Sequence, residues 1–453
     1  MRAEIFKAYD VRGLYPQELD AGAAAAIGRA VARFLGGGGA IVVARDMRDS
    51  GVELRQSLVA GLRSEGVDVI DVGRVATPMM YFATAITGSI GGVMITASHN
   101  PAAYNGLKIC SANAVPIGLE SGLAEIRDLA FELEGREVGP ARGGERREEV
   151  SQRYFDSLVE LFPACPDLHA AIDAGNGIAG EAVSGLLERL PLKTTRLYFE
   201  PDGTFPNHEA DPLKPENLRD LQRAVRREGA DLGVAFDGDG DRAVFVDERG
   251  EAIPADLMTA LLADVVLERG LLSAGPGAVV IHDSRSSRIV AETIRARAAE
   301  PVRSRVGHAF MKEAMRRAGG CFGGELSGHY YFRFPAGYIA DDAAAAMLLL
   351  LQALELRAAP LSELWEPYRR YVQSGELNSP VGEVEATLSR VRAAYPEGEA
   401  DELDGLTVSF PDWWFNLRPS NTEPLLRLNL EAPTRDDMVA KRDRLLSLIA
   451  AAD

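Results

Sequence analysis

Apolar positions in the first third of the chain follow two patterns, one recurring every four residues and one running without interruption. Ile27, Val31 and Leu35 recur at intervals of four behind Asp20, a good N-cap residue, which predicts a helix that the glycines at 36–39 end. Short continuous apolar runs predict buried strands. The elements expected next are strands at 40–44, 67–70 and 93–96, a helix carrying Leu54, Leu58 and Leu62, and a helix opening at Pro78. This order predicts right-handed βαβ units in a parallel sheet.

The same alternation restarts twice. The later elements expected are strands at 170–173, 231–236 and 278–281 and a helix around Ile289 and Ile294. A segment rich in Glu, Arg and Gly at 135–150 is expected to be a linker, and turns at Arg249-Gly250 and Pro360 are further boundary candidates. The alternation becomes less regular after Pro360. The fold class expected is therefore α/β, with α/β domains at 1–143, 144–248 and 249–360 and a smaller α+β domain at 361–453.

Composition and charge argue against some classes of partner and indicate where the protein is located. The 453 residues include 49 Lys and Arg against 67 Asp and Glu, a net charge of −18. Such acidity argues against nucleic acid or an anionic membrane as the main partner, although a locally basic pocket could still take a small anion. Three cysteines without CxxC spacing, a charged N-terminus and no apolar run longer than 343–351 predict a soluble, cytoplasmic protein.

Ser98 lies in the first of several polar loops that follow predicted strands. The loop Thr96-Ala-Ser-His-Asn-Pro101 exposes a hydroxyl beside His99, with Lys108 ten residues on. The carboxyl ends of strands are where open α/β sheets bind ligands, and a hydroxyl becomes a nucleophile only when a base or a positive field activates it. A turn in which Ser and Asn cap backbone amides remains the alternative.

Three carboxylates at alternate positions follow the strand expected at 231–236. In Asp237-Gly-Asp-Gly-Asp-Arg242 the glycines allow the backbone to curl, so that the carboxylates can converge on one hard cation. An EF-hand is excluded because Arg242 stands where that loop needs glycine and because 243–246 has a strand pattern. An acidic surface turn is the other alternative. Mg²⁺ is favoured, since few protein ligands leave room for a phosphate oxygen.

Two further loops carry groups suited to sugars and phosphates. Gly323-Gly-Glu-Leu-Ser-Gly-His329 places Glu325, Ser327 and His329 at alternate positions, on one side of an extended segment that suits sugar hydroxyls. Arg418-Pro-Ser-Asn-Thr-Glu-Pro424 offers many donors and little apolar bulk, which fits an oxyanion. Polar turns are again the alternative for both. The nucleotide signatures GxGxxG, in a suitable context, and Walker A do not occur.

Taken in order, these loops resemble those of the α-D-phosphohexomutases, the family of phosphomannomutase and phosphoglucomutase. The segments that carry the resemblance are Ala8–Gly13, Thr96–Pro101, Asp237–Arg242, Gly324–His329 and Arg418–Pro424. The resemblance extends over essentially the whole chain. It implies three α/β domains with mixed sheets and a mobile C-terminal domain, arranged around a central active-site cleft.

The resemblance also implies roles for individual residues. Ser98 would carry the exchanged phosphoryl group and, with Asp237, Asp239 and Asp241, hold one Mg²⁺ per chain. The groups implied beside the reacting hydroxyl and phosphate are His99, Lys108, Arg12 and Arg242. The substrate contacts implied are Tyr9, His308, Glu325, Ser327, His329, Arg418, Ser420, Asn421 and Thr422. Arg285 stands where many relatives have lysine, which is not an equivalent contact.

The expected function is that of a Mg²⁺-dependent phosphomannomutase, with phosphoglucomutase activity as a further possibility. It would interconvert hexose 1-phosphate and hexose 6-phosphate through phosphoserine and a hexose 1,6-bisphosphate intermediate. The expected partners are hexose phosphates, without nucleic acid or membrane, in a monomer or homodimer. Alternatives are a phosphoglucosamine mutase and a catalytically silent sugar-phosphate binder. A simple Mg²⁺ phosphatase is disfavoured because no residue is obviously placed to activate water.

Overall fold

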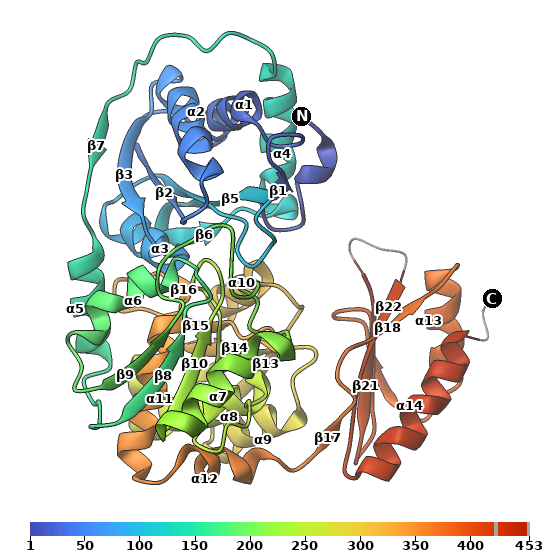
Figure 1. The fold of residues 1–453 in the computed structure, drawn as a ribbon. Coiled ribbons are helices and arrows are strands. Elements are labelled where there is room, and N and C mark those ends of the chain that lie inside the picture. The colour runs from blue at the N-terminus through green and yellow to red at the C-terminus, as the bar shows by residue number, and fades with distance from the viewer. Residues whose placement is uncertain (421–424, 451–453) are drawn as a thin grey trace. The chain divides into compact units, whose positions relative to one another are not determined.

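The structure, a computed structural model, describes residues 1–420 and 425–450 (Figure 1). The chain divides into two compact units. The first unit contains residues 1–255 and 327–364, and the second contains residues 256–326 and the chain from Trp365 onward. The chain therefore leaves the first unit and later returns to it.

The first sheet of the first unit is mixed. Its order is β1-β5-β4-β2-β3-β7, with β6 also paired to β5. Neighbouring strands β4, β2, β3 and β7 run parallel, whereas β5 pairs antiparallel with β1, β4 and β6. The strands are β1 (Val11–Leu14), β2 (Ala40–Arg45), β3 (Asp68–Arg74), β4 (Gly91–Ile95), β5 (Tyr104–Ser111), β6 (Val115–Pro116) and β7 (Glu145–Arg147). The accompanying helices are α1 (Ala21–Phe34), α2 (Ser50–Ser64), α3 (Thr77–Ile86) and α4 (Leu123–Leu133).

The apolar pattern of this region corresponds to a real core. The Asp20 carboxylate accepts a hydrogen bond from the Ala23 N–H at 2.8 Å, as an N-cap should, and α1 ends just before the glycine run. Ile27 of α1 and Leu58 of α2 are fully buried in one cluster with Val43 of β2. The helices and strands expected here are therefore confirmed.

The expected linker at 135–150 is only partly one. Residues 145–147 form β7, which pairs in parallel with β3 from Val69 to Asp71. All three β7 side chains are exposed and charged. Pairing at a sheet edge uses backbone groups, and exposed charges are common on edge strands, so the apolar pattern gave no sign of this strand.

The second sheet of the first unit has the order β11-β10-β8-β9. Strands β10, β8 and β9 are parallel, and β11 returns antiparallel to β10. The elements are α5 (Ser151–Leu161), β8 (His169–Asp173), α6 (Ala179–Leu187), β9 (Lys193–Leu197), α7 (Arg219–Glu228), β10 (Leu232–Phe236) and β11 (Ala243–Asp247). The returning chain adds β15 (Tyr330–Arg333), β16 (Ile339–Asp341) and α11 (Ala343–Arg357), and α12 (Leu361–Trp365) begins in this unit.

Helix α11 contains the longest apolar run of the sequence. Its residues from Ala343 to Leu354 are all buried, and it packs against β11, which identifies it as a core helix. Within the described residues, no single helix is long and apolar enough to cross a membrane, and only α11 taken together with the bent helical segment after it passes that test, by length and composition alone.

The second unit contains a parallel set of strands and a separate antiparallel sheet. Its first part has β12 between β13 and β14, all parallel. The elements are α8 (Ala255–Arg269), β12 (Val279–Asp283), α9 (Arg288–Ala296), β13 (Glu300–Ser304), α10 (His308–Ala318) and β14 (Phe322–Gly324). Short 3-10 helices in the two units lie at Ala3–Ile5, Ala112–Ala114, Leu119–Ser121, Pro215–Leu218, Leu271–Ser273 and Glu366–Tyr368.

The C-terminal sheet is antiparallel throughout. Its order is β17-β22-β21-β20-β19, with β18 also paired to β22. The elements are β17 (Val372–Gln373), β18 (Leu377–Pro380), α13 (Val384–Ala393), β19 (Glu399–Asp401), β20 (Leu406–Ser409), β21 (Trp414–Pro419), β22 (Leu425–Ala432) and α14 (Arg435–Ala450). Phe415, Leu428 and Leu445 share its core. The less regular pattern after Pro360 thus marks a change of architecture, as expected.

Candidate active site

Ser98 lies in the loop that joins β4 to β5, which we call the Ser98 loop (residues 96–103). Strand β5 returns antiparallel to β4, so the loop closes a β-hairpin and does not lead into a helix. Ser98 is fully buried and has a φ of 51°, a left-handed conformation that is unfavourable for a serine. Its backbone N–H donates to Thr96 Oγ1 at 2.8 Å. Its hydroxyl donates to Asp237 Oδ2 at 2.8 Å.

Asp237, Asp239 and Asp241 lie in the aspartate loop (residues 237–242), which closes the β10–β11 hairpin. All three are buried, and each offers an oxygen within 4.8 Å of the others. Asp237 Oδ1 holds the curl of the loop by accepting the N–H groups of Gly240, Asp241 and Arg242 at 3.0, 3.1 and 3.2 Å. The spacing of carboxylates and glycines therefore produces a convergent set of oxygens rather than a surface turn.

A glycine lets the two loops approach each other. A Cβ at Gly238 would lie 2.3 Å from the carbonyl oxygen of Ser98, which is closer than real Cβ contacts. Gly240 has a φ of 75°, which also favours glycine. The glycines of the aspartate loop thus serve both the curl of the loop and its contact with the Ser98 loop.

Lys108 supplies the positive charge nearest the aspartates. It lies on β5, and its ammonium donates to Asp239 Oδ2 at 2.6 Å and to Asp241. Burial alone would lower the pKa of Lys108, but Asp239 and Asp241 reverse that effect and raise it. Burial would likewise raise the pKa of Asp241, and Lys108 together with His329 holds it well below the ordinary value. Lys108 therefore carries its proton at neutral pH.

The surroundings shift the pKa values of Asp237 and His99 in opposite directions. Burial and the charges of Asp241 and Asp239 raise the pKa of Asp237 well above its ordinary value. Burial, followed by the positive charges of Arg242 and Arg12, lowers the pKa of His99 well below that of free histidine. His99 is therefore neutral, and its Nδ1 lies 3.2 Å from Ser98 Oγ.

The two arginines expected near the reacting phosphate border the same loops. Arg12 Nη1 donates to Asn100 Oδ1 of the Ser98 loop at 2.6 Å, and the guanidinium also pairs with Asp10. Arg242 Nε lies 3.8 Å from Asp237 Oδ2. Tyr9 lies in the bend just before β1 and is partly buried. The first unit thus gathers most of the basic groups expected to face a phosphate.

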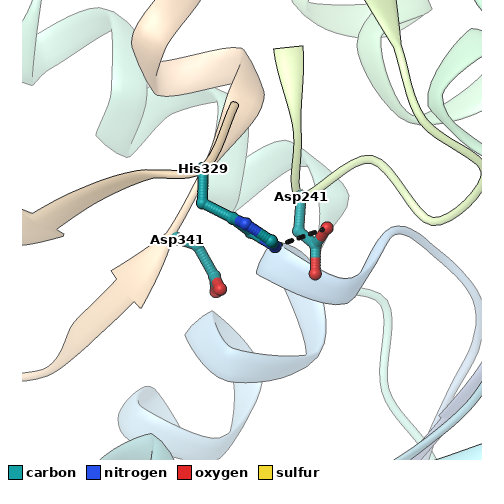
Figure 2. A group of neighbouring side chains, drawn as sticks. All are labelled: Asp241, His329 and Asp341. Atoms are coloured by element: carbon teal, nitrogen blue, oxygen red, sulfur yellow. Dashed lines mark ion pairs between the residues drawn. The ribbon is translucent and has the colours of Figure 1, made fainter. Parts of the chain in front are cut away.

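His329 lies beside the aspartate loop. A backbone bridge pairs Arg242 with His329, and His329 Nε2 lies 3.5 Å from Asp241 Oδ1. Figure 2 shows the imidazole reaching toward Asp241, with the carboxylate of Asp341 nearby. Its Nδ1 lies 2.8 Å from Ser327 Oγ.

The expectation of one extended segment from Glu325 to His329 is wrong. The chain turns at 326–328, where Gly328 has a φ of 81°. The carbonyl of Gly328 accepts the Ala243 N–H at 3.0 Å. Glu325 belongs to the second unit and Ser327 and His329 to the first. The alternation of polar residues therefore reflected a turn, not the period of a strand.

In the second unit, Glu325 and Arg285 form the centre of a buried network. Glu325 Oε1 accepts the N–H of Gly307 at 2.9 Å and lies 3.5 Å from Arg285 Nη2. His308 follows Gly307 as the first residue of α10. Arg285 also pairs with Asp283, whose Oδ2 is 2.7 Å from Nη2. The network holds Arg285 next to Glu325.

Glu376 links this network to the C-terminal sheet. It was absent from the sequence-based expectations. Its carboxylate lies 3.6 Å from Arg285 and 2.9 Å from Arg418, and it accepts a hydrogen bond from Arg427 at 2.8 Å. Burial would raise the pKa of Glu376, but Arg418 and Arg285 lower it.

Glu376 brings the guanidiniums of Arg285, Arg418 and Arg427 together, and guanidinium groups are well suited to bind a phosphate. Ser420 Oγ accepts a hydrogen bond from Arg427 at 3.4 Å. Asn421 and Thr422, the remaining expected contacts, lie outside the described residues.

Two features of the first unit also escaped the sequence reasoning. Thr77, at the start of α3, donates its hydroxyl to Asp239 Oδ2 at 2.6 Å, and its N–H bonds the Asp239 carbonyl at 2.9 Å. Arg48, which is buried, donates to carbonyl groups of the Ser98 loop. Both act on backbone or already named carboxylates, and no motif in the sequence pointed to them.

The aspartate loop has the chemistry of a site for a hard divalent cation. Among residues 1–420 and 425–450, no group donates a hydrogen bond to the buried Asp239 Oδ1. Such a buried carboxylate oxygen needs a partner, and oxygen ligands in small number are what Mg²⁺ takes when a phosphate completes its shell. The residues present therefore fit Mg²⁺. The neighbouring hydroxyl, neutral imidazole and cations suit phosphoryl transfer.

Comparison with known proteins gives consistent matches over the whole chain. Four phosphoglucomutase/phosphomannomutase domain families match in succession: α/β/α domain I at residues 3–136, domain II at 152–250, domain III at 254–371 and the C-terminal domain at 376–446. These matches confirm the expected order of three α/β domains and a C-terminal domain.

Individual relatives match at similar length. The chain is 38% identical to a phosphomannomutase of Escherichia coli, over 98% of both sequences. It is 39% identical to the phosphohexose mutases of Xanthomonas campestris pv. campestris, over 96% of each. A crystal structure of a phosphoglucomutase/phosphomannomutase family protein from Burkholderia thailandensis superposes with a TM-score of 0.90 at 34% identity, covering 100% of this chain and 98% of that one.

Proposed function

The chain belongs to the phosphoglucomutase/phosphomannomutase family, and on that basis we propose that it is a Mg²⁺-dependent phosphomannomutase that also accepts glucose phosphates. The reaction proposed is the interconversion of hexose 1-phosphate and hexose 6-phosphate. The names of the relatives support mannose phosphate as the first substrate, and the broader name phosphohexose mutases supports a wider range.

The observation that carries the proposal is the contact between Ser98 and the aspartate loop. Ser98 Oγ lies 2.8 Å from Asp237 Oδ2, and Lys108 pairs with Asp239 and Asp241 of the same loop. Phosphorylation of Ser98 would add a charge of about −1.5 to −2 at this buried position. A divalent cation and Lys108 would neutralise it, so the acidic loop and the lysine together suit a phosphoserine better than an unmodified serine.

In the proposed reaction, Ser98 exchanges one phosphoryl group with the sugar. A hydroxyl of the hexose monophosphate attacks the phosphorus of phosphorylated Ser98, the P–Oγ bond breaks, and a hexose 1,6-bisphosphate forms. The sugar hydroxyl gives up its proton and Ser98 Oγ gains one, so the step balances. Transfer of the other phosphate back to Ser98 releases the isomeric monophosphate and leaves the enzyme phosphorylated.

The residues of the first unit have separate roles in this step. Neutral His99, with Nδ1 3.2 Å from Ser98 Oγ, holds the hydroxyl proton while Ser98 accepts the phosphoryl group. Protonated Lys108, together with Arg12 and Arg242, stabilises the charge of the transferring group. Asp237, Asp239 and Asp241 would hold Mg²⁺, which supplies charge neutralisation for the phosphoryl oxygens when bound.

The second unit is proposed to hold the rest of the substrate. Glu325 and His308 would contact sugar hydroxyls, as would Ser327 and His329 from the first unit, and Tyr9 is proposed as a further substrate contact. The group proposed to hold the phosphate that does not react is Arg285, Arg418, Ser420, Asn421 and Thr422, and Arg427 joins it because it shares Glu376 with Arg418. A group of several hydrogen-bond donors suits a phosphate that comes from either end of the sugar.

The remaining sequence-based expectations also stand as proposals. The domain boundaries proposed are near residues 143, 248 and 360. A cytoplasmic protein is supported by the three cysteines, Cys110, Cys165 and Cys321, none of which forms a disulfide. The protein is proposed to act as a monomer or homodimer on small hexose phosphates.

The proposal is tested by intact mass and by a coupled mutase assay. The purified protein should carry one phosphoryl group, and mannose 1-phosphate should be isomerised in the presence of Mg²⁺ and a catalytic amount of hexose 1,6-bisphosphate. Ser98→Ala should lose both the phosphate and the activity. Ser64→Ala removes another buried serine hydroxyl, which donates to the Gly61 carbonyl within α2, and serves as the matched control.

Two results would contradict the proposal. A Ser98→Ala variant that still turns over hexose phosphates at the wild-type rate would exclude the phosphoserine route. A clear preference for glucosamine 1-phosphate over mannose and glucose 1-phosphates would assign the protein to the phosphoglucosamine branch instead.

A further inference from the structure

Arg48 is a buried arginine whose guanidinium is surrounded by backbone carbonyls of the Ser98 loop and the residue that follows it. Its side chain is 1% exposed. Nη2 donates to the carbonyls of Ser98 and Asn100 at 2.9 and 2.5 Å. Nη1 donates to the carbonyls of Pro101 and Tyr104 at 2.9 and 3.0 Å. One planar side chain therefore holds three carbonyls of the loop and the carbonyl of Tyr104, the first residue of β5.

Asp46 fixes both this guanidinium and the start of the loop. Its carboxylate lies 3.3 Å from Arg48 Nε and accepts the Arg48 backbone N–H at 3.0 Å. It also accepts the Thr96 hydroxyl at 2.7 Å, and Thr96 Oγ1 in turn accepts the Ser98 N–H at 2.8 Å. Ser98 is thus held at its N–H through Thr96 and at its carbonyl by Arg48.

The backbone of Ser98 needs such support. Its φ of 51° is a conformation that a serine leaves unless its surroundings determine it. Its carbonyl also faces Gly238, where a Cβ would come within 2.3 Å. A small rotation of the Ser98 peptide would therefore both relieve the left-handed backbone and move Oγ away from Asp237.

We propose that Arg48 is a positioning residue for phosphoryl transfer, which holds the backbone of the Ser98 loop so that Ser98 Oγ stays on Asp237. The proposal rests on the function proposed above. Arginine suits this task because its guanidinium presents five N–H donors in a fixed plane. Lysine carries the same charge but cannot reach four carbonyls in that arrangement.

Arg48 acts through the backbone and not on the substrate. In addition to its burial, its guanidinium lies under the ring of Phe205, 5.1 Å from the centroid. A Cβ at Gly203 would lie 3.0 Å from Arg48 Cα, so that segment covers the residue closely. Loss of the guanidinium should therefore change how well Ser98 reacts, and should change little in how the substrate binds.

The test compares Arg48→Lys with the wild-type enzyme and with Arg29→Lys. Arg29 is also largely buried, but it pairs with Glu65 away from the Ser98 loop. For Arg48→Lys we expect kcat for hexose 1-phosphate to fall by about 100-fold, the order that follows a misplacement of reacting groups by about 1 Å. We expect KM to change by less than about threefold, because the substrate contacts are untouched. Arg29→Lys should keep both constants.

A readout that a purely structural role would not move is chemical rescue. Arg48→Ala removes the side chain, and added guanidinium at non-denaturing concentration should restore part of kcat with saturation, whereas ammonium should not. Each variant is assayed well below its Tm, so that loss of folded protein is accounted for separately.

The outcomes separate the inference from the function on which it rests. If the wild-type protein neither carries phosphate on Ser98 nor isomerises hexose phosphates, the proposed function fails, and the role of Arg48 fails with it. If the wild type is active, then either Arg48→Lys with a kcat within threefold of it, or a loss confined to Tm, overturns the role of Arg48 alone. Absence of rescue by guanidinium also counts against it.

Discussion

Lys108 Nζ and Asp239 Oδ2 lie 2.6 Å apart, with the lysine side chain 7% exposed and the aspartate fully buried. The same ammonium also contacts Asp241. Lys108 therefore pairs with two of the three carboxylates proposed for Mg²⁺, and the two cations would share these ligands. Because Lys108 and Mg²⁺ would compete for the same carboxylates, removal of the lysine should change how strongly the metal binds.

Replacement of Lys108 by Met should change the response of the protein to metal. Without the ammonium, buried carboxylates lose a partner, and the free energy of unfolding in chelator should fall by about 3–5 kcal/mol. Added Mg²⁺ should raise the Tm of Lys108→Met more than that of the wild type. Lys214→Met, at an exposed pair with Glu209, is the control. An equal rise of Tm in both proteins would contradict the shared site.

Gly238→Ala should separate the Ser98 loop from the aspartate loop. The new Cβ would meet the Ser98 carbonyl at 2.3 Å, so one loop must move. We expect kcat to fall by about tenfold or more and stability to drop by about 1–3 kcal/mol. Gly139→Ala is the matched control, since its Cβ would meet nothing within 4 Å. Wild-type kcat in Gly238→Ala would show that the contact is not needed.

Asp342 makes the stability of the first unit depend on pH. It caps α11 by accepting the Ala345 N–H, accepts the Tyr154 hydroxyl at 2.8 Å, and burial raises its pKa to about 7. The folded state thus binds the proton more tightly than the unfolded state, whose pKa is about 3.9. This stabilisation is complete below about pH 4 and is lost as pH rises through 7.

The variant Asp342→Asn should remove this pH dependence while keeping an oxygen for the cap. Between pH 4 and 7 its free energy of unfolding should fall by less than that of the wild type, with a difference of about 4 kcal/mol at most. Denaturant unfolding at a series of pH values measures this. Asp20→Asn, at the exposed cap of α1, should keep the wild-type profile. Parallel profiles for Asp342→Asn and the wild type would refute the assignment.

Arg418→Gln should weaken substrate binding without affecting the phosphorylated serine. Arg418 belongs to the arginine group around Glu376 in the second unit, whereas Ser98 lies in the first. We expect KM for hexose 1-phosphate to rise by about tenfold or more, the order for loss of a charge-assisted hydrogen bond. The phosphate content of the purified protein should stay at the wild-type level. The exposed Arg435→Gln is the control, and an unchanged KM in Arg418→Gln would remove Arg418 from the site.

Side-chain patterns predicted much of the fold because helices and strands bury their apolar residues at different periods. Asp20, the glycine run after α1 and the strand behind the aspartate loop all appeared where the pattern placed them. Edge strand β7 did not, because its pairing needs only backbone groups and its side chains are all charged. The segment from Glu325 to His329 has the alternation of a strand but turns at Gly328.

Some residues of the candidate site could likewise be predicted from the sequence, and others could not. Ser98 and the three aspartates stand out because their side chains carry the chemistry and the glycines between them are unusual. Arg48 and Thr77 contact backbone carbonyls and an already named carboxylate, and such contacts leave no spacing to recognise. Glu376 joins Arg285 to Arg418 and Arg427 of two neighbouring strands, and only the folded chain brings Arg285 to that pair.

The division of the chain into two units also bears on how the protein is made. Residues 1–255 leave the ribosome before residues 327–364 have been synthesised, yet α11 of the later segment packs against β11 of the earlier one. His329, which lies beside Asp241, arrives with that later segment. A nascent chain that stops before residue 327 therefore holds Ser98, Lys108 and all three aspartates without the core helix that completes their unit. The first unit can therefore be completed only after residues 256–326 of the second unit have been translated.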